Sequence, residues 1–575
     1  MDRLNPIFTE STQCQDCYKC VRHCPVKAIK VENGSATVMP EICVLCGRCV
    51  EVCPVGAKRI RDDLSRARQL LRRKSRVYVS LAPSFVTEFP GLEPERLISA
   101  LKLLGFAGVS ETSLGAQEVS AACAALIENG DRDIYISSAC PVVVEYIRRH
   151  SPSSVGFITP LLSPALAHCR LLKRHFGEEI GIVFINPCVA KKGEADNNSD
   201  LLDLSITFED LRNWFQGEGV DPYSCPISEE HVFLPERARE GALYPMDGGM
   251  ISGILQGRSL PDVTFMAFSG HQAVLQALEG LDTMPRGRKI FMEILACDGG
   301  CVNGPRSARK GATAAKRMAI ENYAPQGLDQ PATAMVETGA SYDAVTVSRQ
   351  THTPAQIQQA LILVGKSDSE DELNCGGCGY YSCRDFAMAL LEGRAEPSMC
   401  VSYMRKLAMK KANALIKAIP SGVVIVDRNL KVIECNERFA RLLGDDAQLV
   451  FDARRGLEGA SMEKLVPFHN LFTLVMEGSE EVLIKDLRLQ ERIVRLSVFP
   501  IEKGRIVGAI LQDITQPAVR REHIVDKARE VIKKNLTTVQ KIACLLGENA
   551  AESEIILNSI IESFSISDAG DEKKN

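Results

Sequence analysis

The feature that most constrains the fold is a cysteine run that occurs twice in the first sixty residues. Each copy has the spacing C-x2-C-x2-C-x3-C and is followed by proline; the members are Cys14, Cys17, Cys20 and Cys24, and then Cys43, Cys46, Cys49 and Cys53. The N-terminus has no apolar signal core, so we expect a cytoplasmic protein in a reducing compartment. There, metal ligation explains the chain's 21 cysteines better than disulfide bonds do. The run therefore predicts a metal-bound domain that holds either iron–sulfur clusters or zinc.

The repeated run resembles that of the bacterial two-cluster ferredoxins, in which the fourth cysteine of each copy ligates the cluster of the other copy. The resemblance implies two [4Fe–4S] clusters rather than zinc. One would be held by Cys14, Cys17, Cys20 and Cys53, and the other by Cys43, Cys46, Cys49 and Cys24. We expect this ferredoxin-like domain over residues 1–62, with a tight hairpin at Asn33-Gly34. Clusters held so close together conduct electrons and do not bind substrate.

Length and charge set the wider frame. At 575 residues the chain is too long for one hydrophobic core, which predicts several domains. It has 68 basic and 73 acidic residues, a net charge of −5, which gives no reason to expect nucleic acid or a membrane surface as a partner. No apolar run is long enough to span a bilayer. We therefore expect a soluble multidomain protein that combines α+β and α/β folds.

Strand and helix patterns alternate between about residues 75 and 350, which predicts an α/β domain with parallel sheets. The expected strands include 77–81, 134–136, 182–185, 263–268 and 291–296. Ligands of such folds bind beyond the carboxyl ends of the strands. Three of these strands lead into cysteines, which are Cys140, Cys188, Cys297 and Cys301. Four thiols are the number that one further cubane cluster needs, and Gly299-Gly300 lets the backbone approach a metal.

Three stretches of this domain resemble the signature motifs of the [FeFe]-hydrogenases, namely Ser138–Pro141, Asn186–Glu194 and Glu293–Gly304. The resemblance covers Met1 to about Ser348, because those enzymes often carry a ferredoxin domain ahead of the catalytic one. It implies a two-lobed domain whose four cysteines hold a [4Fe–4S] cubane. It also implies that Cys301 bridges the cubane to a di-iron unit with CO, CN⁻ and a dithiolate amine. Together the two parts form the H-cluster, which converts H2 to protons and electrons.

Two charged side chains of the second motif belong to the same implied site. Lys191 matches the lysine that hydrogen-bonds a cyanide in the family, and a cation suits the negative charge of cyanide on low-valent iron. Glu194 matches the motif's glutamate, whereas the methionine that heads the motif is replaced by Asn186. We take Lys191, Glu194 and Cys301 as the candidate catalytic residues. The alternative for Lys191 is an exposed loop lysine.

The chain departs from the family where protons are moved. Catalytic members have a cysteine just before the first cubane ligand, which passes protons between solvent and the cluster amine, but this chain has Ala139. The family's carboxylate on the preceding helix is also missing, since that region is Ser120–Cys123. Proton transfer needs a titratable group within hydrogen-bond reach, so we predict a centre that binds or slowly converts H2. Water, Cys123 or Cys169 would have to restore the path, and an assay of H2 oxidation with an artificial acceptor would reveal it.

A further cysteine set lies within residues 355–403. Its members are Cys375, Cys378, Cys383 and Cys400. The first three lie on a glycine-rich loop, and a helix from about Arg384 to Glu392 leads to the fourth. The set resembles a small Fe–S domain of several redox and corrinoid proteins, which implies one more [4Fe–4S] cluster; zinc is the alternative. The other cysteines are expected to be ordinary residues: Cys123, Cys169, Cys225, Cys435 and Cys544.

Residues 412–516 resemble a PAS domain. The resemblance rests on an opening strand at 421–427, an N-x-x-F motif at Asn436–Phe439 and a closing strand that ends at Asp513-Ile514-Thr515. A helix with Met404 and Leu415 on its apolar face precedes the domain. No haem-ligand histidine or flavin-reactive cysteine motif is evident in the sequence. We therefore favour a PAS domain for dimerisation and signal relay over one that binds a ligand.

The segment 517–566 predicts a helical signalling or dimerisation element. Apolar residues at a 3–4 spacing between Val525 and Leu546 predict a short coiled coil, with Asn535 as the polar member that fixes register. A second helix, capped by Asn549 and Glu552, would complete a hairpin or a dimer. The sequence shows no kinase, cyclase or DNA-binding output, so the output is expected to pass through a downstream signalling protein.

These features favour a sensory [FeFe]-hydrogenase that senses H2, passes electrons through its clusters and signals to a partner as a homodimer. A metabolic hydrogenase that exchanges electrons with a partner such as ferredoxin is disfavoured by Ala139. An Fe–S redox sensor without the di-iron unit is disfavoured by the retained Cys301, Lys191 and Glu194. Infrared bands of CO and CN⁻ that shift with H2 would separate these hypotheses.

Overall fold

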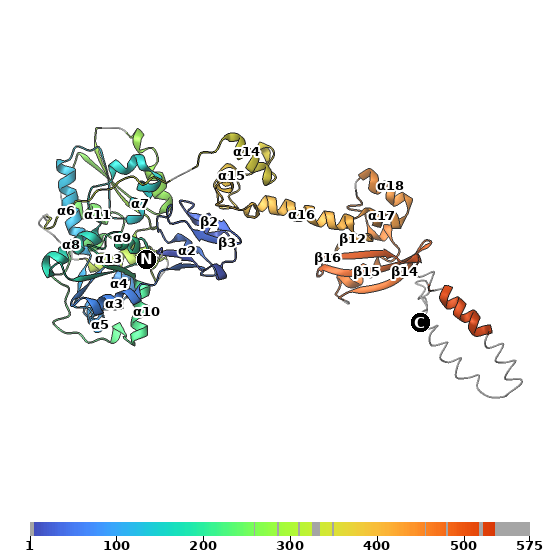
Figure 1. Cartoon of the computed structure of the whole chain (residues 1–575), viewed down its shortest axis with the longest axis horizontal. Coiled ribbons are helices and arrows are strands. Elements are labelled where there is room, and N and C mark those ends of the chain that lie inside the picture. Colours follow the sequence, from blue (N-terminus) through green and yellow to red (C-terminus); the bar gives the residue numbers. More distant parts are fainter. Residues whose placement is uncertain are drawn as a thin grey trace, which may run out of the picture. The chain divides into compact units, whose positions relative to one another are not determined.

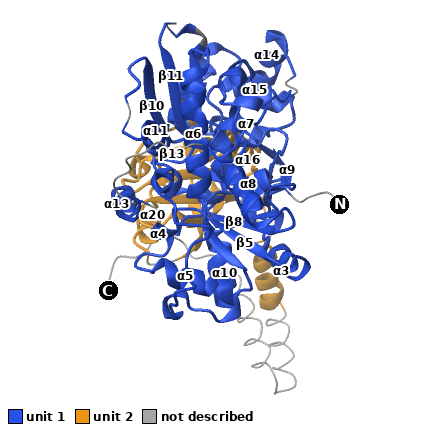
Figure 2. Ribbon diagram, turned by 90° about the vertical axis from the view of Figure 1, so that its left-hand side faces the viewer, with its two compact units in different colours: residues 1–403 blue, residues 404–575 orange. Residues whose placement is uncertain are grey.

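The computed structural model describes residues 5–257, 259–284, 287–308, 311–324, 334–347, 350–454, 456–478, 481–516, 521 and 523–534. The chain divides into two compact units, residues 1–403 and residues 404–575 (Figure 2). The first contains the cysteine-rich segments and two parallel sheets, and the second contains an antiparallel sheet with its helices (Figure 1). Among the described residues, no helix combines the length and the apolar character that crossing a membrane requires.

The N-terminal part of the first unit is built from short antiparallel strand pairs and short helices. Strand β1 (Ile7–Thr9) pairs with β4 (Lys58–Ile60), and β2 (Ile29–Glu32) pairs with β3 (Ser35–Val38). Asn33 and Gly34 form the predicted tight turn between β2 and β3, and both have positive φ, 53° and 69°. The helices of this part are α1 (Lys19–His23) and α2 (Arg48–Val52).

Two parallel sheets follow, with strand orders β6-β5-β8-β9 and β10-β11-β7. Their strands are β5 (Val77–Leu81), β6 (Gly108–Glu111), β7 (Ile134–Ile136), β8 (Gly181–Asn186), β9 (Leu204–Thr207), β10 (Val263–Ser269) and β11 (Lys289–Leu295). Every residue of β5 and β8 is buried. Helices cover both faces of such sheets, so their strands are continuously apolar rather than alternating in the sequence.

Helices connect the strands of the two sheets. They are α3 (Leu64–Arg73), α4 (Phe85–Glu88), α5 (Pro94–Leu103), α6 (Ser113–Asn129), α7 (Pro141–His150), α8 (Pro164–Phe176), α9 (Ala190–Asn197), α10 (Phe208–Glu218), α11 (Gly249–Leu255), α12 (His271–Leu278) and α13 (Thr313–Tyr323). Proline opens α5, α7 and α8, where its missing N–H costs no hydrogen bond. The predicted capping box of α10 is present between Thr207 and Asp210.

The last part of the first unit packs against the N-terminal part. It contains α14 (Pro354–Leu363) and α15 (Cys383–Leu391). Phe386 and Met399 share one hydrophobic cluster with Val21 and Val31. The backbone N–H of Val31 also donates to the carbonyl of Arg394 at 2.9 Å. Segments more than 350 residues apart therefore form one continuous core.

The second unit has an antiparallel sheet with the strand order β13-β12-β16-β15-β14. Its elements are β12 (Gly422–Asp427), β13 (Val432–Cys435), α17 (Glu437–Leu443), α18 (Asp445–Arg454), α19 (Met462–Leu465), α20 (Asn470–Met476), β14 (Leu483–Leu489), β15 (Arg492–Glu502) and β16 (Ile506–Asp513). Phe439, Met462 and Phe472 are fully buried against the sheet. Asn436 caps α17 by accepting from the Phe439 N–H at 2.9 Å.

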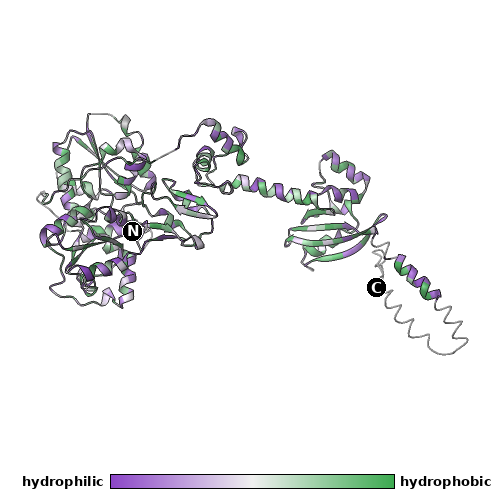
Figure 3. Cartoon of the chain, in the orientation of Figure 1, coloured by the Kyte–Doolittle hydropathy of each residue, from purple (hydrophilic) through white to green (hydrophobic). Residues whose placement is uncertain are grey.

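Helix α16 (Val401–Ala418) precedes this sheet, and none of its residues is buried. Hydrophilic and hydrophobic residues are interspersed along it (Figure 3). Residues 523–534 are also helical. The rest of the predicted segment 517–566, including Cys544, lies outside the described residues apart from residue 521, so the coiled coil stays a prediction.

The expected fold class is confirmed: the chain is multidomain, with parallel α/β sheets in two lobes, a small strand-and-helix part at the start of the first unit, a small helical part at its end, and a second unit that combines an antiparallel sheet with helices. The strands predicted from apolar runs lie within one or two residues of the observed β5, β7, β8, β10 and β11. These runs could be assigned because a doubly covered parallel strand leaves a continuous apolar stretch in the sequence.

A buried polar chain crosses the core between β5, β6 and α8. The imidazole of His168 is fully buried, with Nδ1 2.8 Å from Ser80 Oγ and Nε2 2.8 Å from Ser110 Oγ. The Ser80 hydroxyl also contacts Thr112 Oγ1 at 2.7 Å. Burial lowers the pKa of His168 to about 3, so the folded protein holds this ring neutral.

This burial predicts an acid-sensitive first unit. Below the ordinary histidine pKa of about 6.5, His168 is protonated in the unfolded chain but stays neutral in the folded chain. The free energy of unfolding therefore keeps its full value above about pH 6.5 and falls as the pH is lowered. For His168 the loss between about pH 7.5 and 5.5 is about 1.4 kcal/mol. Denaturant unfolding of the full chain at both pH values should show this loss in the wild type and a smaller one in His168→Gln. An equal pH dependence in both proteins would contradict the prediction.

Candidate functional site

The four cysteines predicted to hold the third cubane come together from both parallel sheets. Cys140 follows β7 and Cys297 follows β11, which are neighbours in one sheet. Cys188 follows β8 of the other sheet, and Cys301 begins the next turn after Cys297. Each thiol lies close enough to the others to affect their ionisation. The lobes therefore meet with their strand ends facing one site, as the parallel-sheet argument predicts.

The environment of these thiols suits a metal cluster. Burial and the neighbouring Cys140 raise the pKa of Cys188 to about 11, and burial with the other thiols raises the pKa of Cys297 and Cys301 far above the ordinary value. Four buried thiols this close together cannot ionise together without positive charge beside them, and iron would supply that charge. Among the described residues, no three His, Cys, Asp or Glu side chains converge as the ligands of one metal ion do. In a cubane, each of the four cysteines would instead hold a different iron.

Gly300 shapes the loop between the last two cysteines. Its φ is +98°, and a Cβ on it would lie 2.3 Å from the Pro245 carbonyl oxygen. Gly299 also has positive φ, +77°. The loop can therefore pass close to its neighbours only because these two residues have no side chain.

Lys191 and Glu194 form one ion pair beside the cysteines. The ammonium donates to Glu194 Oε2 at 2.7 Å and to Ser163 Oγ at 3.0 Å. Both side chains are about 10% exposed, so the alternative of an exposed loop lysine is wrong. The charge of Lys191 also acts on Cys188 and Cys301, whose pKa values it lowers against the effect of burial.

Two replaced family positions have visible local roles. The side-chain oxygen of Asn186 accepts from the Cys188 N–H at 2.8 Å, and its amide donates to Ser205 Oγ at 2.8 Å. Ala139 has only its backbone N–H in a hydrogen bond, to Ser137 Oγ at 3.2 Å. Asn186 thus supports the turn that carries Cys188, whereas Ala139 brings no exchangeable proton.

The two thiols considered as substitutes for that proton relay are poorly suited to the task. Cys123 and Cys169 are fully buried, and burial raises the pKa of each far above the ordinary value. Cys169 does lie near Glu194 and Lys191, whose charges act on it. A thiol that holds its proton so tightly is a slow acid and a slower base at neutral pH.

The N-terminal cysteines group as the ferredoxin-like spacing implies for the second cluster. Cys24 lies near Cys43, Cys46 and Cys49, and its charge raises the pKa of all three together with burial. Cys14 and Cys17 act on Cys20 in the same way. Cys53 is close to a set of backbone N–H groups, from Val55 to Lys58, that lower its pKa. Its place beside Cys14, Cys17 and Cys20 stays a prediction.

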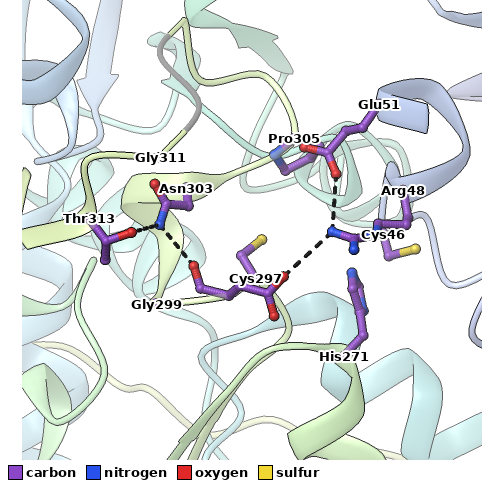
Figure 4. Close-up of a pocket in the computed structure, with 11 residues that line it drawn as sticks. Cys46, Arg48, Glu51, His271, Cys297, Gly299, Asn303, Pro305, Gly311 and Thr313 are labelled. Carbon is purple, nitrogen blue, oxygen red and sulfur yellow. Dashed lines mark hydrogen bonds and ion pairs between the residues drawn. The ribbon is translucent and has the colours of Figure 1, made fainter. Parts of the chain in front are cut away.

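A polar cavity of about 380 Å³ is lined by both Cys46 and Cys297 (Figure 4). The guanidinium of Arg48 lies 3.5 Å from Asp298 Oδ2 and 3.8 Å from Glu51 Oε2. His271 lines the same cavity, and burial lowers its pKa. The cysteine set of the ferredoxin-like part and that of the two sheets therefore face one space.

The structure adds residues that sequence reasoning missed. Arg48 and Asp298 each lie beside a predicted ligand, but their pairing joins positions 250 residues apart and leaves no local pattern. Burial raises the pKa of Glu293, within the third motif, to about 7, and its Oε2 accepts from the Ile251 N–H at 3.1 Å. A charged residue inside the apolar strand β11 is the signal that could have identified it.

The last cysteine set docks on the ferredoxin-like part. Arg22 donates to the carbonyl of Cys17 at 2.9 Å and to that of Gly377 at 3.3 Å, so one guanidinium bridges the two cysteine loops. The ammonium of Lys27 lies over the ring of Tyr381, with Nζ 4.5 Å from the ring centroid, as in a cation–π contact. Cys383 and Cys400 are buried, whereas Cys375 is exposed.

Comparisons with known proteins agree with this site. The model of the iron only hydrogenase large subunit, C-terminal domain, matches residues 75–305. A 4Fe-4S dicluster model matches residues 6–68, an Fe–S cluster model matches 371–402, and a PAS model matches 411–480. The chain is an [FeFe]-hydrogenase-like protein. The same matches make it an iron–sulfur protein with a PAS domain, as the sequence predicts.

Relatives of this hydrogenase-like chain are distant. The large subunit of the periplasmic [Fe] hydrogenase of Nitratidesulfovibrio vulgaris is 22% identical over 365 residues, which cover 53% of this chain and 86% of that protein. Iron hydrogenase 1 of Clostridium pasteurianum is 23% identical over 255 residues, or 36% of this chain and 44% of that protein. The solved structure of a variant of the [FeFe]-hydrogenase HydA1 from Chlamydomonas reinhardtii is 18% identical, covers 50% of this chain and 100% of that chain, and has a TM-score of 0.40.

The geometry of the Gly300 turn predicts that Gly300→Ala abolishes cluster loading in the hydrogenase-like domain. The added methyl would collide with the Pro245 carbonyl, beyond the roughly 1–2 kcal/mol that positive φ costs any L-residue. Gly257→Ala is the matched control, because Gly257 also has positive φ but open space around it. Iron and sulfide analysis should show one cluster fewer in the first variant only. Equal iron content in the two variants would contradict the close-approach argument.

Proposed function

We propose that the chain is a sensory [FeFe]-hydrogenase, which binds or slowly converts H2 and reports the result through its PAS domain. One observation carries the proposal above the others. The cysteine set, Lys191 and Glu194 form a complete buried site, while the position that relays protons in catalytic members is Ala139. In this proposal the chain keeps the groups that bind the cofactor and lacks the proton-relay side chain on which a high rate of H2 turnover depends.

The residues of the site have separate tasks in this proposal. When bound, the di-iron unit supplies the chemistry that splits H2 into two protons and two electrons. Cys140, Cys188, Cys297 and Cys301 would hold the cubane, and Cys301 would also hold the di-iron unit. Lys191 would offer an ammonium donor to a cyanide, and Glu194 holds the ammonium in place and balances its charge. Ala139 cannot hold a proton at its side chain, so this position cannot pass protons between the cofactor and solvent.

Electrons would leave through the accessory clusters. Cys297 and Cys46 face one cavity, which supports transfer from the cubane to the cluster of Cys43, Cys46, Cys49 and Cys24. The Arg22 bridge between the loops of Cys17 and Gly377 supports onward transfer to the set Cys375, Cys378, Cys383 and Cys400. Cys400 directly precedes α16, which leads along the chain to the PAS domain. We therefore propose four [4Fe–4S] clusters, with the last one next to the signalling helix.

The downstream steps are part of the same proposal. The apolar residues of α16 are exposed, Met409 by 57% and Leu415 by 67%, which supports a homodimer that covers them. The signal would pass to a separate cytoplasmic signalling protein. A metabolic role with ferredoxin as redox partner remains the second candidate, favoured by the family match over residues 75–305.

Infrared spectroscopy of anaerobically matured protein tests the cofactor. We expect CO and CN⁻ bands that shift when H2 is added. Cys301→Ala should lose these bands, because it removes the link to the di-iron unit, and Cys123→Ala should keep them, because Cys123 is a buried thiol outside the set. A wild type with full cubane iron and no such bands would leave only an Fe–S redox sensor.

Turnover tests the sensory assignment. Ala139→Cys restores a titratable group, and general acid–base catalysis is worth about 10²–10⁴-fold, so H2 oxidation with an artificial acceptor should rise by at least about tenfold. Ala139→Ser adds a similar volume without a usable pKa and should stay near the wild type. A wild-type rate equal to that of a catalytic relative would instead favour the metabolic role.

A further inference from the structure

Helix α9 carries charged residues on two of its sides. Lys191 and Glu194 lie three positions apart and pair with each other beside the cysteines. Lys192 and Asp196 lie four positions apart, which places them on one side of a helix, about 100° around from Lys191. The Lys192 side chain is fully buried and that of Asp196 is 11% exposed. The ion pairs of Lys192 and Asp196 are with charged side chains and not with the cysteines.

The second side of α9 is held by the segment that joins the ferredoxin-like part to the two sheets. Lys192 donates to Asp63 Oδ2 at 3.1 Å, and Asp196 Oδ2 accepts from Arg61 at 2.7 Å. Arg61 and Asp63 also pair directly, at 2.9 Å. Three ion pairs thus link four side chains in a row, and helix α9, which carries Lys192 and Asp196 at the two ends of the row, closes it into a ring.

Two further groups, one of each charge, pair with members of this ring and keep it neutral. Asp210 accepts from Lys192 at 2.9 Å, and Arg66 donates to Asp63 at 2.8 Å. The cluster then has three cations, Arg61, Arg66 and Lys192, and three anions, Asp63, Asp196 and Asp210. Burial alone would raise the pKa of Asp63, but Lys192 and Arg61 lower it, so the carboxylate stays charged.

We infer that Lys192 and Asp196 are positioning residues that fix the rotation of α9 and thereby aim Lys191 at the cofactor. A helix of only two turns has little rigidity of its own, and a rotation that frees Lys192 from Asp63 carries Lys191 away from Cys188 and Cys301. Removing one partner from a buried charge pair is costly, so the ring has one favoured arrangement. The role of Lys191 in this inference rests on the proposed function. The holding of α9 by its ion pairs does not.

The ring also ties the site to the ferredoxin-like part. Arg61 and Asp63 follow β4 directly in the chain. Any displacement of that part relative to the sheets therefore acts on the helix that carries Lys191, as well as on the cavity between Cys46 and Cys297. The buried charge of Lys192 is paired with Asp63, which belongs to the segment after β4. The site lies between the two sheets, but the ion pairs that hold its helix α9 depend on this N-terminal segment.

Two variants and a control test the inference on the full chain. Lys192→Met keeps the length of the side chain and removes its charge, leaving Asp63 with Arg61 and Arg66. Asp196→Asn weakens the second ion pair of α9, the one with Arg61, at a side chain that is less deeply buried than Lys192. Lys74→Met removes a lysine that pairs with Asp203 at 3.0 Å, which is not a residue of α9, and serves as the matched control. Lys191→Met gives the spectrum of a site without its ammonium.

The first measurement is hydrogen exchange of the α9 amides in protein that carries cubanes but no di-iron unit. Lys192→Met and Asp196→Asn should speed this exchange by about tenfold or more, whereas Lys74→Met should not, because local opening follows the loss of buried anchors. The second is infrared spectroscopy after maturation. The CN⁻ bands of Lys192→Met should move in the same direction as those of Lys191→Met, with unchanged iron content.

The outcomes separate this inference from the proposed function. Normal α9 exchange and wild-type CN⁻ bands in a loaded Lys192→Met protein would overturn it. If Lys192→Met fails to fold, faster exchange in Asp196→Asn supports the inference and unchanged exchange overturns it. A wild type without any CO or CN⁻ bands would defeat the di-iron proposal, and the exchange result would still decide whether the ring holds α9.

Discussion

The structure depends on bringing four buried thiols together at the junction of two parallel sheets. Burial and mutual repulsion keep Cys188, Cys297 and Cys301 protonated in the absence of a compensating charge. A bound cluster would reverse this preference, because iron stabilises thiolates that the protein alone disfavours. The two lobes would then gain stability from the cofactor at the point where they meet. The positive-φ glycines of the Cys297–Cys301 turn serve the same end by removing side chains from a crowded loop.

The other parts of the first unit are arranged around that junction. The ferredoxin-like part contributes Cys46 and Arg48 to the cavity beside Cys297, and its last residues enter the ion-pair ring under α9. The small cysteine domain packs on the opposite end of the ferredoxin-like part through a shared apolar core and Arg22. The contacts that hold these parts together are therefore the same ones that the proposed electron transfer would use, because clusters must lie close together to exchange electrons.

The departures from the hydrogenase motifs affect the expected proton path and leave the cysteines of the site in place. Asn186 replaces an apolar residue and still supports the Cys188 turn through its hydrogen bonds. Ala139 stands where the family motif has a proton relay, and Cys123 and Cys169 are too deeply buried to substitute for it. The proposed site thus retains the residues expected to hold the cofactor and lacks the residue expected to relay its protons. A site of this kind suits detection, in which occupancy or reduction is the signal, better than sustained flux.

The sequence by itself determined the cluster spacings, the buried strands and the PAS resemblance, because each is set by local spacing or by a continuous apolar run. It also predicted that strand ends would bring the four cysteines together. Only the tertiary structure decided which long-range pairs form: Arg48 with Asp298, Arg22 with two carbonyls, and Lys192 with Asp63. Such pairs join residues up to 355 positions apart, and their energies depend on burial that no local pattern encodes.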